Sequence, residues 1–560
     1  MAVEQLQRQL EAIAADLGGS AEGVQLETPR NPEHGDVASN LALVLARPLR
    51  RNPRELAQQI LARLDLAAAG VEAADIAGPG FINFRFASAS VQALVCDVIA
   101  ADRGYGRATT GQGRRVLIEF VSANPTGPLH VAHGRGAALG DAIAALLDWT
   151  GHAVSREYYV NDAGVQIDRL GESVDARWRQ LHGEAAAIPE GGYHGDYVLE
   201  LARRFDAEQG SELAALAAPT RIRRFRDLAV SALREEQDAD LRAFGVFFDS
   251  YFSETTLYAE QRLLETLAEL HERGLTYAQE GATWLRTSAF GDDKDRVLVK
   301  GDGSFTYFLP DIAYHRDKAR RGFAHAINVW GADHHGYVPR MKAALAALGL
   351  RDFLDVEIVQ MVRIMRGGTE AKFSKRAGDF VTLRELFEET GSDVARYFFL
   401  MRRGDTQMLF DLDLALDQSE KNPVFKVQYA HARMMSIFRR AGVAADEVSA
   451  SAAEVAALTH ESERTLIKQL GMFPRIVERA AEARAPHIVC DYLETTAGIV
   501  NSWYHAGNPS RNPELAVLVA DPDIRRARLA LARATRIVLR NGLELLGLAA
   551  PDRMDREETE

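Results

Sequence analysis

The segment SANPTGPLHVAHGRG, residues 122–136, places His130 and His133 three residues apart, behind two prolines and in front of several glycines. Imidazole rings, together with the N–H groups that begin a helix, suit an anionic ligand that carries phosphate. Two histidines at this spacing are more often a surface pair or a satisfied core pair. The segment therefore indicates a phosphate site only when other signals accompany it.

A second segment, AKFSKRAGDF at residues 371–380, supplies such a signal. Lys372 and Lys375 flank Ser374, and Gly378 follows. Two lysines on a loop can neutralise charge on a transferred or departing phosphate, although a solvated basic loop is the commoner outcome. No GxGxxG fingerprint or phosphate-binding P-loop opens the region of the histidines. The two segments together, in this order, are more specific than either one.

The elements around the histidines predict a βαβ unit. Residues 116–121 form an apolar run of strand length that Glu119 interrupts, a helix closed by Gly151 follows the histidines, and residues 153–162 form a second strand candidate. Such a unit implies a parallel sheet, whose ligands bind at the carboxyl ends of the strands. Further strand candidates lie at 327–330 and 356–362. We expect a doubly wound α/β domain over 112–385, with a largely helical insertion at about 165–280.

The flanking regions differ in character. Residues 1–104 predict a small α+β domain, in which Leu6, Leu10, Ile13 and Leu17 recur at helical spacing. In its strand GFINFRF, Ile82, Phe84 and Phe86 form an apolar face that should be buried. A Gly/Thr-rich linker follows at 104–113. From 386 to 560 the pattern predicts helices and no strand.

Composition narrows the class. The net charge of −13 argues against a general nucleic-acid coat, although the stretch 524–540 has six arginines and no acid. That stretch is either a solvated helix face or a local phosphate contact. Cys96 and Cys490 are the only cysteines, at no metal-ligand spacing, so neither a disulfide framework nor a zinc site is expected. With no signal-peptide pattern and no long apolar run, we expect a soluble, cytoplasmic protein.

The two segments resemble the signatures of class I aminoacyl-tRNA synthetases. His-Val-Ala-His resembles the HIGH signature and Lys-Phe-Ser-Lys-Arg the KMSKS signature. Longer segments, among them IEFVSANPTGPLHVAHGRGAALGD, REYYVNDAGVQI, DGSFTYFLPDIAYH and VWGADHHGYVPRM, resemble bacterial arginyl-tRNA synthetases. HGDVASNLAL and GPGFINFRF resemble that family's N-terminal domain, and SDVARYFFL and NPVFKVQYAHAR its helical anticodon-binding domain. Ala132, Phe373 and Arg376 depart from the usual signatures, but no departure removes a charged group.

The resemblance implies an arginine–tRNA ligase that forms arginyl-adenylate from arginine and ATP and transfers the arginyl group to the 3′ end of tRNA(Arg). It implies Mg²⁺ with the ATP, no zinc, and a monomer. The implied catalytic residues are His130, His133, Lys372 and Lys375. The implied ATP-binding residues are Pro125, Gly127, His130, His133, Gly134 and Ser374.

Arginine demands carboxylates, because the guanidinium fork matches an acid in bidentate geometry. Glu119 and Asp311 both lie in apolar surroundings. The resemblance implies arginine contacts from Glu119, Asn124, Tyr307 and Asp311, and from Asp333 and His334. It implies tRNA contacts from Phe81 and Asn83 in the domain 1–104 and from Tyr429 and Arg433 in the domain 386–560, where aromatic stacking can read anticodon bases.

Three alternatives remain at this point. Another class I synthetase would need a different pocket or zinc ligands. A tRNA-binding relative without catalysis is supported only by Ala132. A small-molecule nucleotidyltransferase would not need the long helical region beyond residue 386.

Overall fold

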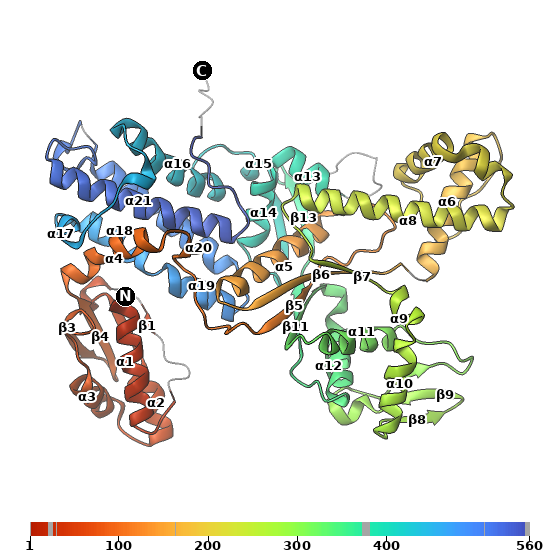
Figure 1. The fold of residues 1–560 in the computed structure, drawn as a ribbon, viewed down its shortest axis with the longest axis horizontal. Helices are drawn as coiled ribbons and strands as arrows, with labels where there is room; N and C mark the ends of the chain where they lie inside the picture. The colour runs from red at the N-terminus through yellow and green to blue at the C-terminus, as the bar shows by residue number, and fades with distance from the viewer. Residues whose placement is uncertain are drawn as a thin grey trace.

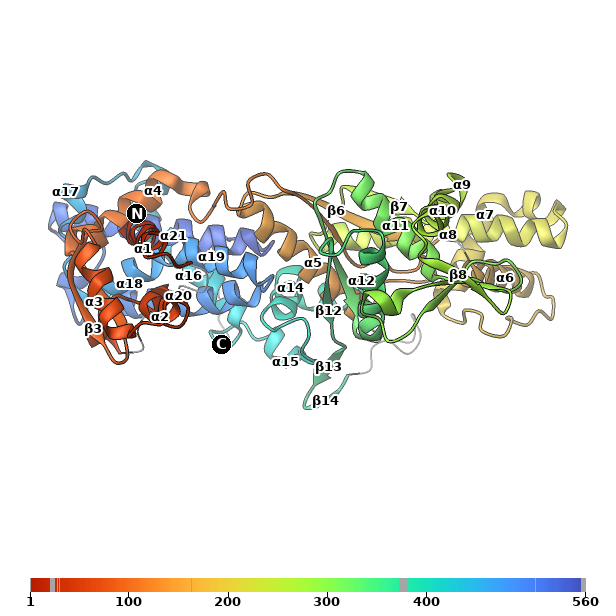
Figure 2. The ribbon, with the colours of Figure 1, turned by 90° about the horizontal axis from the view of Figure 1, so that it is seen from below.

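The computed structural model describes residues 2–20, 26–27, 29, 31–162, 164–371, 381–508 and 510–554. The molecule is elongated (Figures 1 and 2), with the central sheet between a group of N- and C-terminal elements at one end and two smaller units at the other. No helix of the described residues is both long enough and apolar enough to cross a membrane.

The N-terminal domain packs helices on an antiparallel sheet of order β1-β2-β4-β3. Its strands are β1 (Leu26–Glu27), β2 (Val37–Ser39), β3 (Val71–Ala77) and β4 (Phe81–Phe86), and its helices are α1 (Ala2–Asp16), α2 (Leu41–Leu49), α3 (Pro53–Arg63) and α4 (Ser88–Ala101). Ile82, Phe84 and Phe86 are buried. The predicted apolar face of β4 is therefore confirmed.

The central sheet has five parallel strands in the order β12-β11-β5-β6-β7. They are β5 (Arg115–Glu119), β6 (Ala153–Val160), β7 (Ser250–Ser253), β11 (His325–Gly331) and β12 (Leu354–Val359), joined in part by α5 (Val131–Trp149), α11 (Phe308–Arg320) and α12 (Val338–Ala347). Chain order runs outward from β5 in both directions, which is the doubly wound arrangement. Its topological switch point lies at the carboxyl end of β5, where such sheets bind ligands.

Two units are inserted between β6 and β11. The first is a helical subdomain of α6 (Val165–Leu181), α7 (Asp196–Ala215) and α8 (Ala218–Ala243), which encloses a hydrophobic core of its own. The second follows β7 and comprises α9 (Thr255–Ala259), α10 (Arg262–Glu272) and the antiparallel strands β8 (Thr276–Gln279), β9 (Ala282–Leu285) and β10 (Arg296–Val299). The insertion predicted at about 165–280 is therefore continuously helical only to Ala243, because β7 returns to the sheet.

A small sheet of order β14-β13-β15 leads into the C-terminal half. It comprises β13 (Val362–Arg366), β14 (Thr369–Glu370) and β15 (Met408–Asp411), with α13 (Leu383–Thr390), α14 (Ser392–Leu400) and α15 (Leu412–Ala415) beside it. Strand β15 lies where the sequence predicts helices only. Its four residues alternate between buried and exposed, and so short a pattern does not stand out in the sequence.

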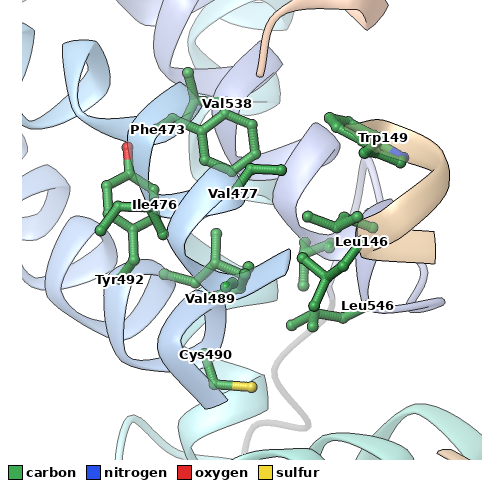
Figure 3. Close-up of a cluster of buried hydrophobic side chains, with 14 of the residues drawn as sticks. Leu146, Trp149, Phe473, Ile476, Val477, Val489, Cys490, Tyr492, Val538 and Leu546 are labelled. Carbon is green, nitrogen blue, oxygen red and sulfur yellow. The ribbon is translucent and has the colours of Figure 1, made fainter. Parts of the chain in front are cut away.

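The rest of the chain is helical, and its core is continuous with that of the central α/β domain. The helices are α16 (Pro423–Ala441), α17 (Ala452–Val455), α18 (Glu461–Gly471), α19 (Phe473–Glu482), α20 (His487–Ala506) and α21 (Pro522–Leu545). Figure 3 shows Leu146 and Trp149 of α5 beside Phe473 and Val477 of α19. Helix α5 thus begins at the predicted site and ends in the C-terminal core.

The arginines of 524–540 pair mostly with the protein itself. Arg528 is buried against Glu463 at 2.7 Å, and Arg540 lies 2.5 Å from Asp102. Arg533 donates to the carbonyl oxygen of Val448 at 2.6 Å. Helix α21 therefore uses much of this basic stretch to hold neighbouring segments, which the sequence pattern alone does not distinguish from a phosphate-binding face.

Candidate functional site

The two histidines lie at the start of α5, directly after the loop that leaves β5. His130 is the N-cap residue, and its backbone N–H donates to His133 Nδ1 at 3.3 Å. The two rings stack with centroids 3.6 Å apart. The pair therefore stands at the switch point of the sheet, beside the N-terminal end of a long helix, where a phosphate is favoured.

Burial keeps both imidazoles uncharged at neutral pH. It lowers the pKa of His130, and it lowers the pKa of His133 to about 3, with the neighbouring His130 as a second cause. Neutral rings can still donate one hydrogen bond each to phosphate oxygens. The pair offers oriented donors without adding positive charge.

Two glycines let α5 approach its neighbours closely. A Cβ on Gly140 would lie 2.3 Å from Phe120, and one on Gly134 would lie 2.5 Å from Leu383 of α13. Gly136 has no such neighbour. Gly134 therefore serves the packing of the helix start that carries the histidines.

The backbone between β5 and the histidines is strained. Val121 and Ser122 have φ of 66° and 41°, which side-chain-bearing residues rarely adopt. Ser122 Oγ donates to Glu119 Oε1 at 3.2 Å and accepts from the Tyr159 backbone N–H at 3.1 Å. These bonds hold the turn that delivers Asn124, whose amide donates to Gln166 at 2.7 Å.

Glu119 is buried and already has a cation. Lys318 Nζ of α11, fully buried, donates to Glu119 Oε2 at 2.6 Å and to Asn328 Oδ1 at 3.0 Å. Both carboxylate oxygens of Glu119 thus have a partner, since Ser122 bonds the other. The residue predicted to bind a guanidinium is shared with a lysine of the protein.

Asp311, near the start of α11, is the less compensated acid. It accepts from the Tyr337 hydroxyl at 2.5 Å. Burial and, to a smaller extent, the charges of Glu119 and Glu254 raise its pKa to about 7, against the effects of that hydrogen bond and of the charge of Lys318. The three carboxylates Glu119, Glu254 and Asp311 therefore lie near one another, and we call them the carboxylate cluster. Burial also raises the pKa of Glu254.

The other predicted arginine contacts are exposed. Tyr307 is the N-cap residue of α11 and is 78% exposed. Asp333 and His334 lie in the 3-10 turn Ala332–Tyr337, just after β11, with Oδ2 and Nε2 3.4 Å apart. All three residues are near the carboxyl edge of the sheet. Among the residues that the structure describes, none holds Asp333 or His334 by a partly buried hydrogen bond such as the one from Tyr337 to Asp311.

The predicted tRNA contacts differ in accessibility. Phe81 is exposed on β4, whereas Asn83 is 3% exposed and donates to Asp75 at 3.3 Å. In the C-terminal half, the Arg433 guanidinium lies 4.6 Å from the ring centroid of Tyr429 and 4.9 Å from that of Tyr504. Arg433 and Tyr429 therefore belong to one cation–aromatic stack across α16 and α20.

Lys372, Ser374 and Lys375 lie outside the described residues. Within the described part of the chain, no group of three or more His, Cys, Asp or Glu side chains could hold a metal ion.

Comparison with known proteins defines the class first. The family profile "tRNA synthetases class I (R), catalytic domain" matches residues 94–409. "Arginyl tRNA synthetase N terminal domain" matches residues 3–86, and "DALR anticodon binding domain" matches residues 427–554. A doubly wound sheet with an HxxH segment at its switch point, flanked by these two domains, defines a class I aminoacyl-tRNA synthetase.

The particular family follows from the relatives. The arginine–tRNA ligase of Bordetella pertussis is 49% identical over 97% of each chain, and arginine–tRNA ligase 1 of Halalkalibacterium halodurans is 44% identical over 99% of this chain and all of its own. The solved arginyl-tRNA synthetase of Thermus thermophilus, 24% identical, shares the fold over 99% of this chain with a TM-score of 0.77. The chain belongs to the arginyl-tRNA synthetase family, and its activity is that of an arginine–tRNA ligase.

Sequence reasoning missed four residues of the site. Glu254 and Tyr337 face Asp311, Lys318 pairs with Glu119, and Gln237 of α8 bonds the loop before the histidines. An acid after the apolar stretch around β7 was the one available signal for Glu254. The other three come from elements far apart in sequence, and no local pattern marks them.

Proposed function

We propose that the chain ligates arginine to tRNA(Arg) in two steps with the residues above in defined roles. The arginine carboxylate attacks the α-phosphorus of ATP and releases pyrophosphate. The 2′-hydroxyl of the terminal ribose of tRNA then attacks the adenylate carbonyl and releases AMP. Neither step needs a covalent bond to the protein, so catalysis consists of positioning and charge stabilisation.

The histidine pair and its loop take the phosphates. Pro125, Gly127, His130, His133 and Gly134 form the ATP-binding backbone and the first donors to the α-phosphate. Lys372 and Lys375, with Ser374, neutralise the departing pyrophosphate. Mg²⁺ arrives with ATP as part of the substrate, since the described residues offer no carboxylate cage of their own.

The carboxylate cluster takes the guanidinium. Burial and two neighbouring acids raise the pKa of Asp311 to about 7. A bound cation therefore relieves the repulsion between these carboxylates in the free site. Glu254 supplies a second buried carboxylate, and Glu119, held by Lys318, orients the strained turn and Asn124. Tyr307, Asp333 and His334 complete the arginine site from its exposed side.

The assignment of the phosphate and guanidinium sites rests on one observation: neutral imidazoles and acidic carboxylates lie at the same edge of the central sheet. The phosphate side presents neutral imidazoles, and the amino-acid side presents the buried carboxylates of Glu119 and Glu254 and the partly buried one of Asp311. Glutamate would be repelled by such a cluster. Lysine would leave part of the hydrogen-bonding capacity of these acids unmet, because its point charge does not match a carboxylate in the bidentate geometry of a guanidinium.

The tRNA contacts both the N-terminal and the C-terminal domain, which lie at the same end of the molecule. The Tyr429–Arg433–Tyr504 stack offers flat surfaces for anticodon bases, and Phe81 offers an exposed ring on the N-terminal domain. Asn83 would contact RNA only after leaving Asp75. We propose a cytoplasmic monomer with an N-terminal tRNA-contacting domain over 1–104, a catalytic domain over 112–385 and an anticodon-binding domain over 386–560.

Charging of total tRNA with each of the twenty labelled amino acids, one at a time, tests the proposal. Arginine alone should appear on tRNA. Charging with another single amino acid would refute the roles given to the carboxylate cluster, and tRNA binding without charging would refute catalysis.

A further inference from the structure

The helical subdomain α6–α8 reaches the ATP-binding loop through one buried glutamine. Gln237, in the last two turns of α8, is 3% exposed. Its Nε2 donates to the carbonyl oxygen of Asn124 at 3.1 Å and to that of Gly127 at 2.8 Å. One side chain therefore holds two loop carbonyls that lie three residues apart.

Two neighbouring tyrosines hold two further carbonyls of the same loop. The Tyr158 hydroxyl of β6 donates to the Ala123 carbonyl at 2.9 Å and to Gln237 Oε1 at 3.1 Å. The Tyr197 hydroxyl of α7 donates to the Thr126 carbonyl at 2.7 Å. Four carbonyls between residues 123 and 127 are thus drawn toward β6, α7 and α8.

Helix α8 is itself held in place by side chains close to Gln237. Asp238 accepts from the Tyr251 hydroxyl of β7, and Asp240 pairs with Arg384 of α13. Gln237 therefore reaches the loop from a helix end that is anchored on two further elements. A loop without regular structure gains a defined conformation from such side-chain bonds.

We propose that Gln237 is a positioning residue for ATP: it fixes the backbone of residues 124–127 so that the loop and the histidine pair present a preformed surface to the nucleotide. This rests on the proposed function, which assigns the loop to ATP. Gln237 acts through Asn124 and Gly127 and does not contact the reacting atoms. Its loss should affect ATP more than arginine, because the side chain of Asn124, which is assigned to arginine, is also held by Gln166.

The test compares Gln237→Met, which keeps the length of the side chain and removes its hydrogen bonds, with Gln180→Met. Gln180 of α6 also donates to a backbone carbonyl, that of Ala186 at 2.6 Å, but at the outer side of the subdomain. Arginine-dependent ATP–pyrophosphate exchange in the presence of tRNA gives KM for each substrate. Gln237→Met should lower kcat/KM for ATP roughly ten- to hundredfold and change KM for arginine less than about threefold. Gln180→Met should behave as the wild type.

Tyr158→Phe supplies a second measurement that does not depend on the first variant folding. It should also raise KM for ATP selectively, and the double variant with Gln237→Met should cost less than the product of the two single effects, because both side chains hold one loop. An unchanged KM for ATP in either single variant, equal changes in both KM values, or strictly multiplicative effects would overturn the proposal. Failure of the proposed function would be visible separately, as absence of arginine-dependent exchange in the wild type.

Discussion

Single residues prepare the two substrates in opposite ways. The histidines are buried and neutral, so they donate hydrogen bonds to phosphate without a change of charge near neutral pH. Asp311 titrates near pH 7, so its charge does change there. The two sides of one reaction centre should therefore respond differently to pH.

His133→Ala should lower the rate of adenylate formation by roughly 10²- to 10³-fold, because it removes an oriented donor from the developing charge on phosphorus. Affinity for tRNA, measured by filter binding, should stay nearly unchanged. His182→Ala is the matched control, since His182 lies on the helical subdomain and pairs with Asp206 at 2.9 Å. Normal turnover by His133→Ala would refute its role.

KM for arginine should rise about tenfold per pH unit below pH 7, because protonation of Asp311 removes the charge that attracts the guanidinium. KM for ATP should stay flat from pH 6 to 8. Steady-state kinetics across this range measures both values. In Asp311→Asn the KM for arginine should be high at every pH, and a variant that keeps the wild-type pH profile would show that another group titrates.

The raised pKa of Asp311 also determines how the stability of the fold changes with pH. The folded pKa of Asp311 lies above its value in the unfolded chain, so its contribution to stability is complete below pH 3.8 and is lost as the pH rises through about 7. Asp311→Asn should therefore raise the melting temperature at pH 8 more than at pH 5. Thermal denaturation at the two pH values checks this, and an equal effect at both would contradict the assignment.

Among the elements, helix α11 carries several buried or partly buried polar side chains that interact with the central sheet. Asp311, Tyr314, His315 and Lys318 recur at helical spacing and share one face, where Tyr314 also donates to Glu157 at 2.7 Å. The sequence shows this face only in part, because its partners Glu119, Glu157 and Asn328 lie on three different strands. In its sequence, α11 resembles an amphipathic helix with charged residues at unexpected positions. In the structure, these residues form a polar part of the core.

Lys318→Met should destabilise the fold by about 3–5 kcal/mol, because Glu119 would remain buried without its cation. Urea denaturation measures the loss. Adding Glu119→Gln should restore a large part of it, since the double variant leaves no buried charge at this position. Independent, additive losses in the two single variants would mean that the pair is not coupled.

How far the elements could be predicted depends on their length. Strands β5, β6, β11 and β12 each overlap a strand candidate of the sequence, and the histidine helix follows from its pattern and its glycine stop. Strands β7 and β15 have four residues each, too few for a pattern to stand out. Asn83 has the alternation of an exposed position, yet it is buried and bonds Asp75, an exposed residue of the neighbouring strand.

The whole molecule links its distant parts through α5. The helix has 19 residues and is therefore about 28 Å long, and it runs from the histidine pair to the core shared with α19 and α20. The sequence predicts the site at the start of α5 through the two signatures, and it predicts the C-terminal helices at the other end of α5. It does not predict the continuity of the core, because packing between α5 and α19 joins residues more than 300 positions apart.

Tyr429→Ala should raise KM for tRNA in the charging reaction by roughly ten- to hundredfold, because stacking on one base is worth about 1–3 kcal/mol. KM for ATP and arginine should not change. Tyr492→Phe is the control, since Tyr492 is buried in the same helical region. A parallel rise in all three KM values would show that the stack supports the fold and not the RNA.

The helical subdomain α6–α8 keeps a separate core, whereas the core of α5 runs on into the C-terminal helices. A unit that buries its own apolar surface can change its length and outer sequence over evolution without repacking the sheet. Its tolerance for sequence change should end at Gln166, Tyr197 and Gln237, the side chains through which it bonds the ATP-binding loop. Relatives with a remodelled subdomain should therefore vary everywhere except at these contacts.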